Sequence, residues 1–419
     1  MNKELTNKIL ITLAFLFAYR ILSYIPVPGV NIDIIAAFFD SNSDNALGMV
    51  NMFSGNAVGR FSIISLGIMP YITASIIMEL LAATFPALGQ MKKERDGMTK
   101  YMQIIRYATV VITIVQAIGI SMGLQTLGSG GQSAVMIDMS LFVPIAAASM
   151  LTGTMLLMWI GEQITQKGIG NGISLIIFAG IVSAMPSAIG GTINLLNSGE
   201  INFLVIIGIL VVVLITIGVI IYIELGERRI PISYSRKTMM QNQNKRVMNY
   251  IPIKVNLSGV IPAIFASAIL MMPTTLMSGS TNPTIQYISD ILSPSGYLYN
   301  VMMFLGVVFF AFFYASITFN AKDISENLKK QGGFIPGVRP GKSTSEFLNE
   351  VASRLTVSGA IYLGLISTLP MLFVKMMGVP FYFGGVAVLI VVQVALDAMR
   401  KIEAQIYMGK YKTLNAVGL

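Results

Sequence analysis

Three arginines are the side chains in this sequence best suited to bind a charged partner. The stretch ERRIPISYSRK (227–237) sets Arg228 and Arg229 beside a proline that restricts the chain to extended conformations. The stretch GGFIPGVRPG (332–341) surrounds Arg339 with glycine and proline, which favours a stiff turn. A guanidinium that is held in one place suits carboxylates or phosphates. We expect these arginines to dock a large partner, with contact to anionic lipid headgroups as the alternative.

Most other side-chain chemistry is excluded by composition. The 419 residues include no histidine and no cysteine. Disulfides, cysteine-based metal sites, histidine-dependent nucleophiles and histidine proton relays are therefore ruled out. The sequence also lacks a G-x-x-x-x-G-K-[ST] phosphate loop, so the chain cannot be its own motor. We predict a protein that is not an enzyme, holds no cofactor and takes its energy from a partner.

The elements that must position the arginines are membrane helices. Hydrophobic residues make up 54% of the chain and charged residues only 11%, whereas soluble domains carry roughly 25% charged residues. A bilayer core of about 30 Å needs about 20 apolar residues in a helix. Ten stretches fit, with approximate ends at 9–25, 62–85, 107–124, 141–160, 173–189, 203–223, 257–276, 299–319, 355–374 and 381–399. The fold class we predict is an all-α polytopic membrane protein.

Basic residues lie mostly on one side of these spans. Of the 28 lysines and arginines, 25 fall at the termini or in the loops after the second, fourth, sixth and eighth spans. The exceptions are Arg60 and Lys375 on the opposite side and Arg20 within the first span. We expect this first span to be retained rather than cleaved as a signal peptide. The positive-inside rule places both termini in the cytoplasm. It also places there two long loops, 224–254 and 321–354, which carry the three arginines.

One motif occurs twice. GIMPYITASII (67–77) and GVIPAIFASAI (259–269) share six of eleven positions, and each contains a proline where a helix should be continuous. They belong to the second span of each of two five-span halves, residues 1–200 and 201–419. A five-span half ends on the opposite side of the membrane, so its successor must insert upside down. Such inverted repeats place the functional centre where the matching interrupted helices meet.

The predicted centre is apolar. Ile72 and Ile264 hold the same position in the two copies, and Ile68 lies one helical turn before Ile72. A ring of β-branched side chains makes a stiff constriction that excludes water and ions. Small residues in both copies would let the two helices approach closely without strong polar contacts. The pattern predicts a neck that could close around any passing side chain.

The segment GMVNMFSGNAVG (48–59) lies on the external side, just before the second span. It is too short and too rich in glycine to cross the membrane. It either re-enters the central cavity as a stopper or lies at the surface. The residues by themselves leave both readings open.

Longer motifs resemble the SecY family, the channel subunits of the bacterial Sec protein translocase. The resemblance lies in GIMPYITASI, IPIKVNLSGVIPAIFAS (251–267), GERRIP, GIGNGIS (168–174) and FIPGVRPG. It implies a clamshell of ten helices in two inverted halves, in the plasma (inner) membrane of a bacterium. It also implies a pore that passes unfolded secretory polypeptides, and a lateral gate between spans 2–3 and 7–8 that releases membrane-protein segments into the bilayer.

The resemblance also implies roles for individual residues and partners. The pore ring would consist of Ile68, Ile72, Ile177, Ile264 and Ile390. The gate helices would carry Pro70, Thr73, Ser75, Pro262 and Ser267, and the plug would carry Met49, Met52 and Phe53. Arg339 would serve the motor ATPase SecA, and Arg228 and Arg229 would engage the ribosome or SecA. SecE and SecG would be companion subunits, and signal peptides and nascent or precursor polypeptides would be the substrates.

An inverted-repeat secondary transporter is the main alternative. Transporters driven by protons or sodium normally display midplane acids or unwound polar ligand sites. Here Glu79 is the only acid well within a predicted span. An intramembrane enzyme is less favoured, because the chain has no histidine and no pair of aspartates within the spans. The sequence therefore favours a channel.

Overall fold

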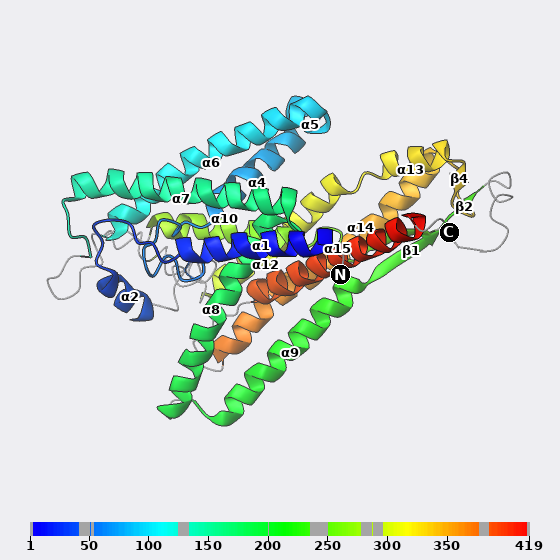
Figure 1. The fold of residues 1–419 in the computed structure, drawn as a ribbon. Helices are drawn as coiled ribbons and strands as arrows, with labels where there is room; N and C mark the ends of the chain where they lie inside the picture. The colour runs from blue at the N-terminus through cyan, green and yellow to red at the C-terminus, as the bar shows by residue number, and fades with distance from the viewer. Residues whose placement is uncertain are drawn as a thin grey trace.

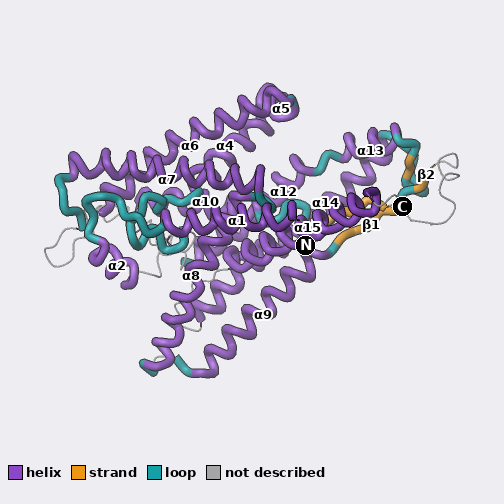
Figure 2. Tube along the Cα trace, viewed as in Figure 1, coloured by secondary structure: helices purple, strands orange, loops and turns teal. Residues whose placement is uncertain are grey.

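The computed structural model describes residues 3–41, 51, 54–124, 134–199, 201–234, 250–277, 287, 296–376 and 385–416. Long helices make up most of this part of the chain, and the short strands lie together at one end (Figures 1 and 2). Helix α1 begins and α15 ends toward this same end, and α2 lies at the opposite end (Figure 1).

The helices of the first half of the chain are α1 (Lys3–Leu22), α2 (Ile32–Ser41), α4 (Met69–Thr84), α5 (Pro86–Lys93), α6 (Arg95–Gly123), α7 (Met139–Lys167) and α8 (Gly172–Asn197). The second half contributes α9 (Phe203–Leu225), α10 (Ile261–Met277), α12 (Tyr297–Thr318), α13 (Ala321–Lys330), α14 (Lys342–Met376) and α15 (Gly385–Ala416).

These helices account for the predicted spans. Within the described residues, seven are long and apolar enough to cross a membrane, or eight if α4 and α5, bent by 115°, are taken as one span. The seven are α1, α6, α7, α8, α9, α12 and α14. Two further predicted spans correspond to α10, a shorter apolar helix, and to the apolar first part of α15. Large apolar side chains along α9 are exposed, as expected of a surface that faces lipid.

Two spans begin later than the sequence predicts. We expected helices from residues 62 and 257, but α4 begins at Met69 and α10 at Ile261. In both copies of the repeat the glycine has a left-handed backbone, with φ of +57° at Gly67 and +64° at Gly259. The proline then falls in the first helical turn, where its missing N–H leaves no hydrogen bond broken. The prolines therefore start these helices rather than interrupt them.

The core of the molecule is a large apolar cluster to which all ten of the span helices contribute. Helix α4 packs against α6 and α10, α10 packs against α12, and α8 packs against α15. A second cluster joins Phe61 and Leu66, which precede α4, to α6 and α7 through residues such as Phe142. The non-helical segment before α4 is thus held inside the protein.

The two long loops of the sequence fold together into one small unit. Strand β1 (Glu227–Pro231) pairs antiparallel with β3 (Tyr250–Lys254), and β2 (Ser233–Tyr234) pairs antiparallel with β4 (Gly333–Phe334). A third apolar cluster lies between them and includes Ile230, Ile253, Leu328 and Leu348. Because β2 and β4 come from different loops, neither loop is an independent extension.

Candidate functional site

The five isoleucines assigned to the pore ring lie in one apolar cluster. Ile68 directly precedes α4, and the others lie within helices, Ile72 in α4, Ile177 in α8, Ile264 in α10 and Ile390 in α15. Ile264 is partly buried, and the other four are buried with at most 6% of their surface exposed. Residues that are up to 322 positions apart in the sequence thus belong to the same central cluster, which they share with many other core residues.

Helices α4 and α10 pack against each other at a seam, and most of the small and apolar residues that the repeat places on them are buried. Pro70, Thr73 and Ala74 of α4 are buried, as are Pro262, Ala266 and Ser267 of α10, and Ser75 is half-buried. The Thr73 hydroxyl donates to the Met69 carbonyl at 3.0 Å, and the Ser267 hydroxyl donates to the Ile264 carbonyl at 2.9 Å. Both hydroxyls are therefore satisfied within their own helix. The seam depends on packing rather than on these hydroxyls.

The predicted plug falls partly outside the described residues. Met49, Met52 and Phe53 lie outside them, whereas Asn51 and residues 54–59 are described. Asn51 holds this segment together. Its side-chain oxygen accepts from the Gly59 N–H at 2.8 Å, and its carbonyl accepts from the Asn56 N–H at 2.8 Å and the Ser54 hydroxyl at 2.9 Å. Ser54, Ala57 and Val58 are buried, so the described part of the segment is internal and not a surface loop.

The three arginines are exposed on the unit formed by the two loops. Arg228 and Arg229 lie on β1. Arg229 donates to Glu227 at 2.6 Å and lies over the Tyr250 ring at 4.9 Å, and the bond to Glu227 raises the pKa of Arg229. Arg339 lies between Gly337 and Gly341, whose φ values are +83° and +103°. The Thr344 hydroxyl donates to the Arg339 carbonyl at 2.9 Å, which fixes the turn while the side chain projects outward.

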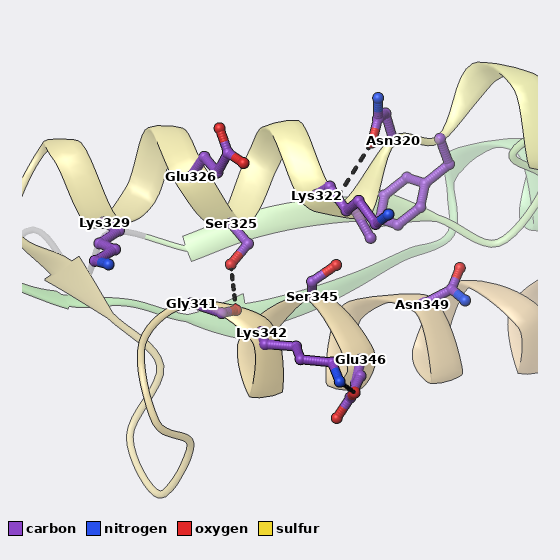
Figure 3. A pocket seen from close by; sticks show the side chains of 12 residues that line it. Asn320, Lys322, Ser325, Glu326, Lys329, Gly341, Lys342, Ser345, Glu346 and Asn349 are labelled. Atoms are coloured by element: carbon purple, nitrogen blue, oxygen red, sulfur yellow. Dashed lines mark hydrogen bonds and ion pairs between the residues drawn. The ribbon is translucent and has the colours of Figure 1, made fainter.

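A polar groove lies beside Arg339. It has a volume of about 610 Å³, and α13 and the first turns of α14 form its walls (Figure 3). The Ser325 hydroxyl donates to the Gly341 carbonyl at 2.7 Å and ties the two walls together, and Lys342 pairs with Glu346 at 3.7 Å. Lys322 and Lys329 also line the groove.

One buried polar group was missed by the sequence analysis, which placed Glu224 in a loop. In the structure α9 continues through Leu225, and Glu224 is only 4% exposed. The Asn256 side chain donates to the Glu224 carboxylate at 2.5 Å and to the Gly259 carbonyl at 3.2 Å. Arg400 of α15 donates to the Glu224 backbone carbonyl at 3.0 Å. These bonds position the turn that starts α10. The sequence signal for this buried contact was an asparagine three residues before the repeat glycine.

The sequence predicted no role for two further arginines, Arg20 and Arg60, but both make specific contacts in the structure. Arg20 donates to the Gly55 carbonyl at 2.9 Å, so it contacts the described part of the plug segment. The guanidinium carbon of Arg60 lies 4.0 Å from the centre of the Tyr24 ring. The sequence feature that could have pointed to these contacts is that both arginines depart from the positive-inside pattern.

Comparison with known proteins identifies the family. Residues 62–399 match the SecY family. The protein translocase subunit SecY of Helicobacter pylori is 68% identical over 419 residues, with both chains covered completely. Among solved structures, one describes the SecY plug domain that stabilises the closed state of the translocation channel and maintains a membrane seal. It aligns with a TM-score of 0.68 and 20% identity, over 96% of this chain and 92% of that chain.

A second solved structure, Sec61 in the canine ribosome-channel complex from the endoplasmic reticulum, aligns with a TM-score of 0.64 and 18% identity. It covers 96% of this chain and 92% of that chain. These two likenesses show the channel fold, and the high identity to the bacterial relative confirms the resemblance drawn from the motifs. The chain belongs to the SecY family.

Proposed function

We propose that this chain is the protein-conducting channel of a bacterial plasma membrane. Unfolded secretory polypeptides pass through it, and membrane-protein segments leave it sideways into the bilayer. The observation that supports the proposal is that the five isoleucines, from four helices and the segment before α4, all belong to the central apolar cluster, which contains no charged side chain among the described residues. A narrow ring of such side chains resists a continuous water column, yet it makes no specific bonds to a passing chain.

The two halves, residues 1–200 and 201–419, are the moving parts of this proposal. The starts of α4 and α10 share a left-handed glycine and a first-turn proline, as expected of equivalent elements in an inverted repeat. The lateral gate lies between α4 and α6 on one side and α10 and α12 on the other. Because Thr73 and Ser267 bond within their own helices, opening this seam leaves both hydroxyls satisfied.

The driving force comes from the cytoplasm, where we place both termini and the unit of strands β1–β4. Arg339 on its fixed turn is the site for the motor ATPase SecA, and Arg228 and Arg229 engage SecA or the ribosome. The exposed guanidiniums suit carboxylates or phosphates. SecE and SecG are the companion subunits, signal peptides enter at the gate, and anionic phospholipids contact the basic cytoplasmic surface.

The test is reconstitution. The chain is inserted into vesicles with homologues of SecE and SecG, and a radiolabelled secretory precursor is added outside with SecA and ATP. Protection of the precursor from added protease, dependent on both SecA and ATP, is the expected result. Vesicles that contain the companion subunits without this chain are the control. Equal protection in that control, or none in the complete system, would refute the proposed function.

A further inference from the structure

Arg20 and Arg60 are both exceptions to the positive-inside pattern of this chain. In the structure their side chains lie close together. Arg20 lies near the end of α1, and Arg60 directly follows residues 54–59, the continuous described part of the predicted plug, which we call the plug segment. Their guanidinium carbons lie 5.0 Å and 4.0 Å from the centre of the same Tyr24 ring. Because topology does not require these charges and a charge within a span is costly, we expect them to have a local function.

Arg20 joins three separate elements. One terminal nitrogen donates to the Gly55 carbonyl of the plug segment at 2.9 Å and to the Ser183 hydroxyl of α8 at 3.1 Å. The other terminal nitrogen donates to the Tyr24 hydroxyl at 3.1 Å. A planar guanidinium makes such a fork without rearrangement, whereas a lysine ammonium does not.

The residues next to Arg20 and Gly55 extend this contact. The Tyr19 hydroxyl, on a side chain that is 2% exposed, donates to the Ser54 carbonyl at 3.1 Å. The Asn56 amide donates to the Ser187 hydroxyl of α8 at 3.3 Å. Three consecutive residues of the plug segment are therefore tied to α1 and α8.

The fit at Gly55 is close. Its φ is +69°, and a Cβ there would lie 2.7 Å from the Ser183 hydroxyl oxygen and 3.3 Å from the Gly180 Cα. The backbone of the plug segment thus approaches α8 at a distance that only glycine permits. Helix α8 also carries Ile177 of the proposed pore ring. A change in this contact therefore acts at the helix that lines the pore.

We propose that Arg20 is a positioning residue that clamps the plug segment to α1 and α8 and so sets how firmly the resting channel is closed. The proposal rests on the proposed function, because it requires the segment to move when the pore opens. Bonds that exist only in the closed state stabilise that state relative to the open one. Loss of the clamp therefore raises the open fraction at rest and relaxes the selection of signal peptides.

Ion leak from vesicles that contain the purified channel complex tests this directly. Arg20→Gln should raise the resting leak by about tenfold, since it removes charge-assisted bonds made in the closed state. Ser183→Ala removes one acceptor and should give a smaller increase. The matched control is Ser198→Ala at the C-cap of the same helix, because both serine hydroxyls donate to a carbonyl of α8 but only Ser183 also accepts from Arg20. Its leak should equal that of the wild type.

A reducible crosslink separates clamping from misfolding. The chain has no cysteine, so Asn56→Cys with Ser187→Cys introduces a single pair across an existing side-chain contact. In the Arg20→Gln background, oxidation of this pair should suppress the leak, and reduction should restore it. A merely structural defect caused by Arg20→Gln would persist in both redox states, and that result would overturn the proposal.

The remaining outcomes separate failure of the clamp from failure of the proposed pore. Wild-type leak in Arg20→Gln and Ser183→Ala, beside raised leak in the pore variant Ile264→Asn, would overturn the clamp and leave the proposed channel intact. Wild-type leak in all three would overturn the pore assignment as well. If Arg20→Gln fails to insert into the membrane, the resting leak of Ser183→Ala is compared with that of Ser198→Ala. Equal leak in those two variants refutes the clamp.

Discussion

At the scale of single residues, two kinds of side chain carry the proposed function: apolar ones that exclude water and exposed arginines that bind a partner. The isoleucines at the core are β-branched and stiff, and all except the partly buried Ile264 are buried, whereas Arg228 and Arg339 are exposed. Neither kind of residue resembles a catalytic group. The first two predictions concern one residue of each kind.

Ile264→Asn should favour the open state of the channel. A buried amide without partners destabilises the closed neck by roughly 1–3 kcal/mol and is relieved when water enters. The expected phenotype is raised resting ion conductance, together with easier export of precursors that carry weak signal sequences. Ile264→Leu keeps the ring apolar and should change both much less. Single-channel recording would contradict the pore assignment if both variants behaved as the wild type does.

Arg339→Glu should abolish translocation driven by SecA while leaving the protein inserted and assembled. The side chain is exposed, so reversing its charge leaves no buried group without a partner. Arg339→Lys keeps the charge but loses the planar fork, and it should retain partial activity. The measurement is protease protection of a precursor in vesicles. Normal activity of Arg339→Glu would remove the motor-docking role of this turn.

At the scale of elements, α4 and α10 begin in the same way, and we propose that their starts set where the pore narrows. A left-handed glycine followed by a proline in the first turn lets each helix begin inside the protein, after a buried irregular segment. Such an irregular backbone is tolerated at membrane depth only where protein surrounds it.

Gly67→Ala should destabilise the protein by about 1 kcal/mol, because an L side chain is disfavoured at a φ of +57°. A Cβ at this position would meet nothing closer than the Ser54 Cβ at 4.0 Å, so crowding adds little. Gly67→Asn should be milder, since asparagine tolerates left-handed conformations. Thermal unfolding of the purified complex should rank the melting temperatures as wild type, then Gly67→Asn, then Gly67→Ala, from highest to lowest. Equal melting of all three proteins would contradict the assigned backbone.

Cysteines at Ile72 and Ile264 should crosslink in the resting channel. The two residues hold the same repeat position on helices that pack against each other, and the chain contains no other cysteine. An arrested translocating polypeptide should block the reaction by separating the helices. A pair at Ile77 and Ile269, which are exposed and also equivalent in the repeat, is the control for chance encounters. Failure with reagents of several lengths would count against this geometry.

At the scale of the whole molecule, we propose that the charges of the loops orient a channel of two opposed halves. Single cysteines test this orientation at two exposed positions, Ser198 at the end of α8 and Gln331 at the end of α13. In intact spheroplasts, an impermeant maleimide should label Ser198→Cys at once and Gln331→Cys only after permeabilisation. Labelling in the reverse order would invert the proposed topology.

The sequence by itself determined the spans and their predicted orientation. Hydropathy acts on each membrane segment almost independently, and basic loops are retained on one side for the same local reason. The ten predicted spans therefore correspond to helices, and the two copies of the repeat begin α4 and α10, which pack against each other. The five isoleucines were named as a set only because long motifs resembled a known family.

Only the tertiary structure decided how distant segments meet. The pairing of β2 with β4, the burial of Glu224 against Asn256 and the bond from Arg20 to Gly55 each join residues from different elements. Hydropathy and charge are properties of one segment at a time, and they carry no record of which faces touch. The starts of α4 and α10 were misjudged for the same reason: an apolar irregular segment has the hydropathy of a helix, and burial among neighbouring helices is what allows it to remain irregular.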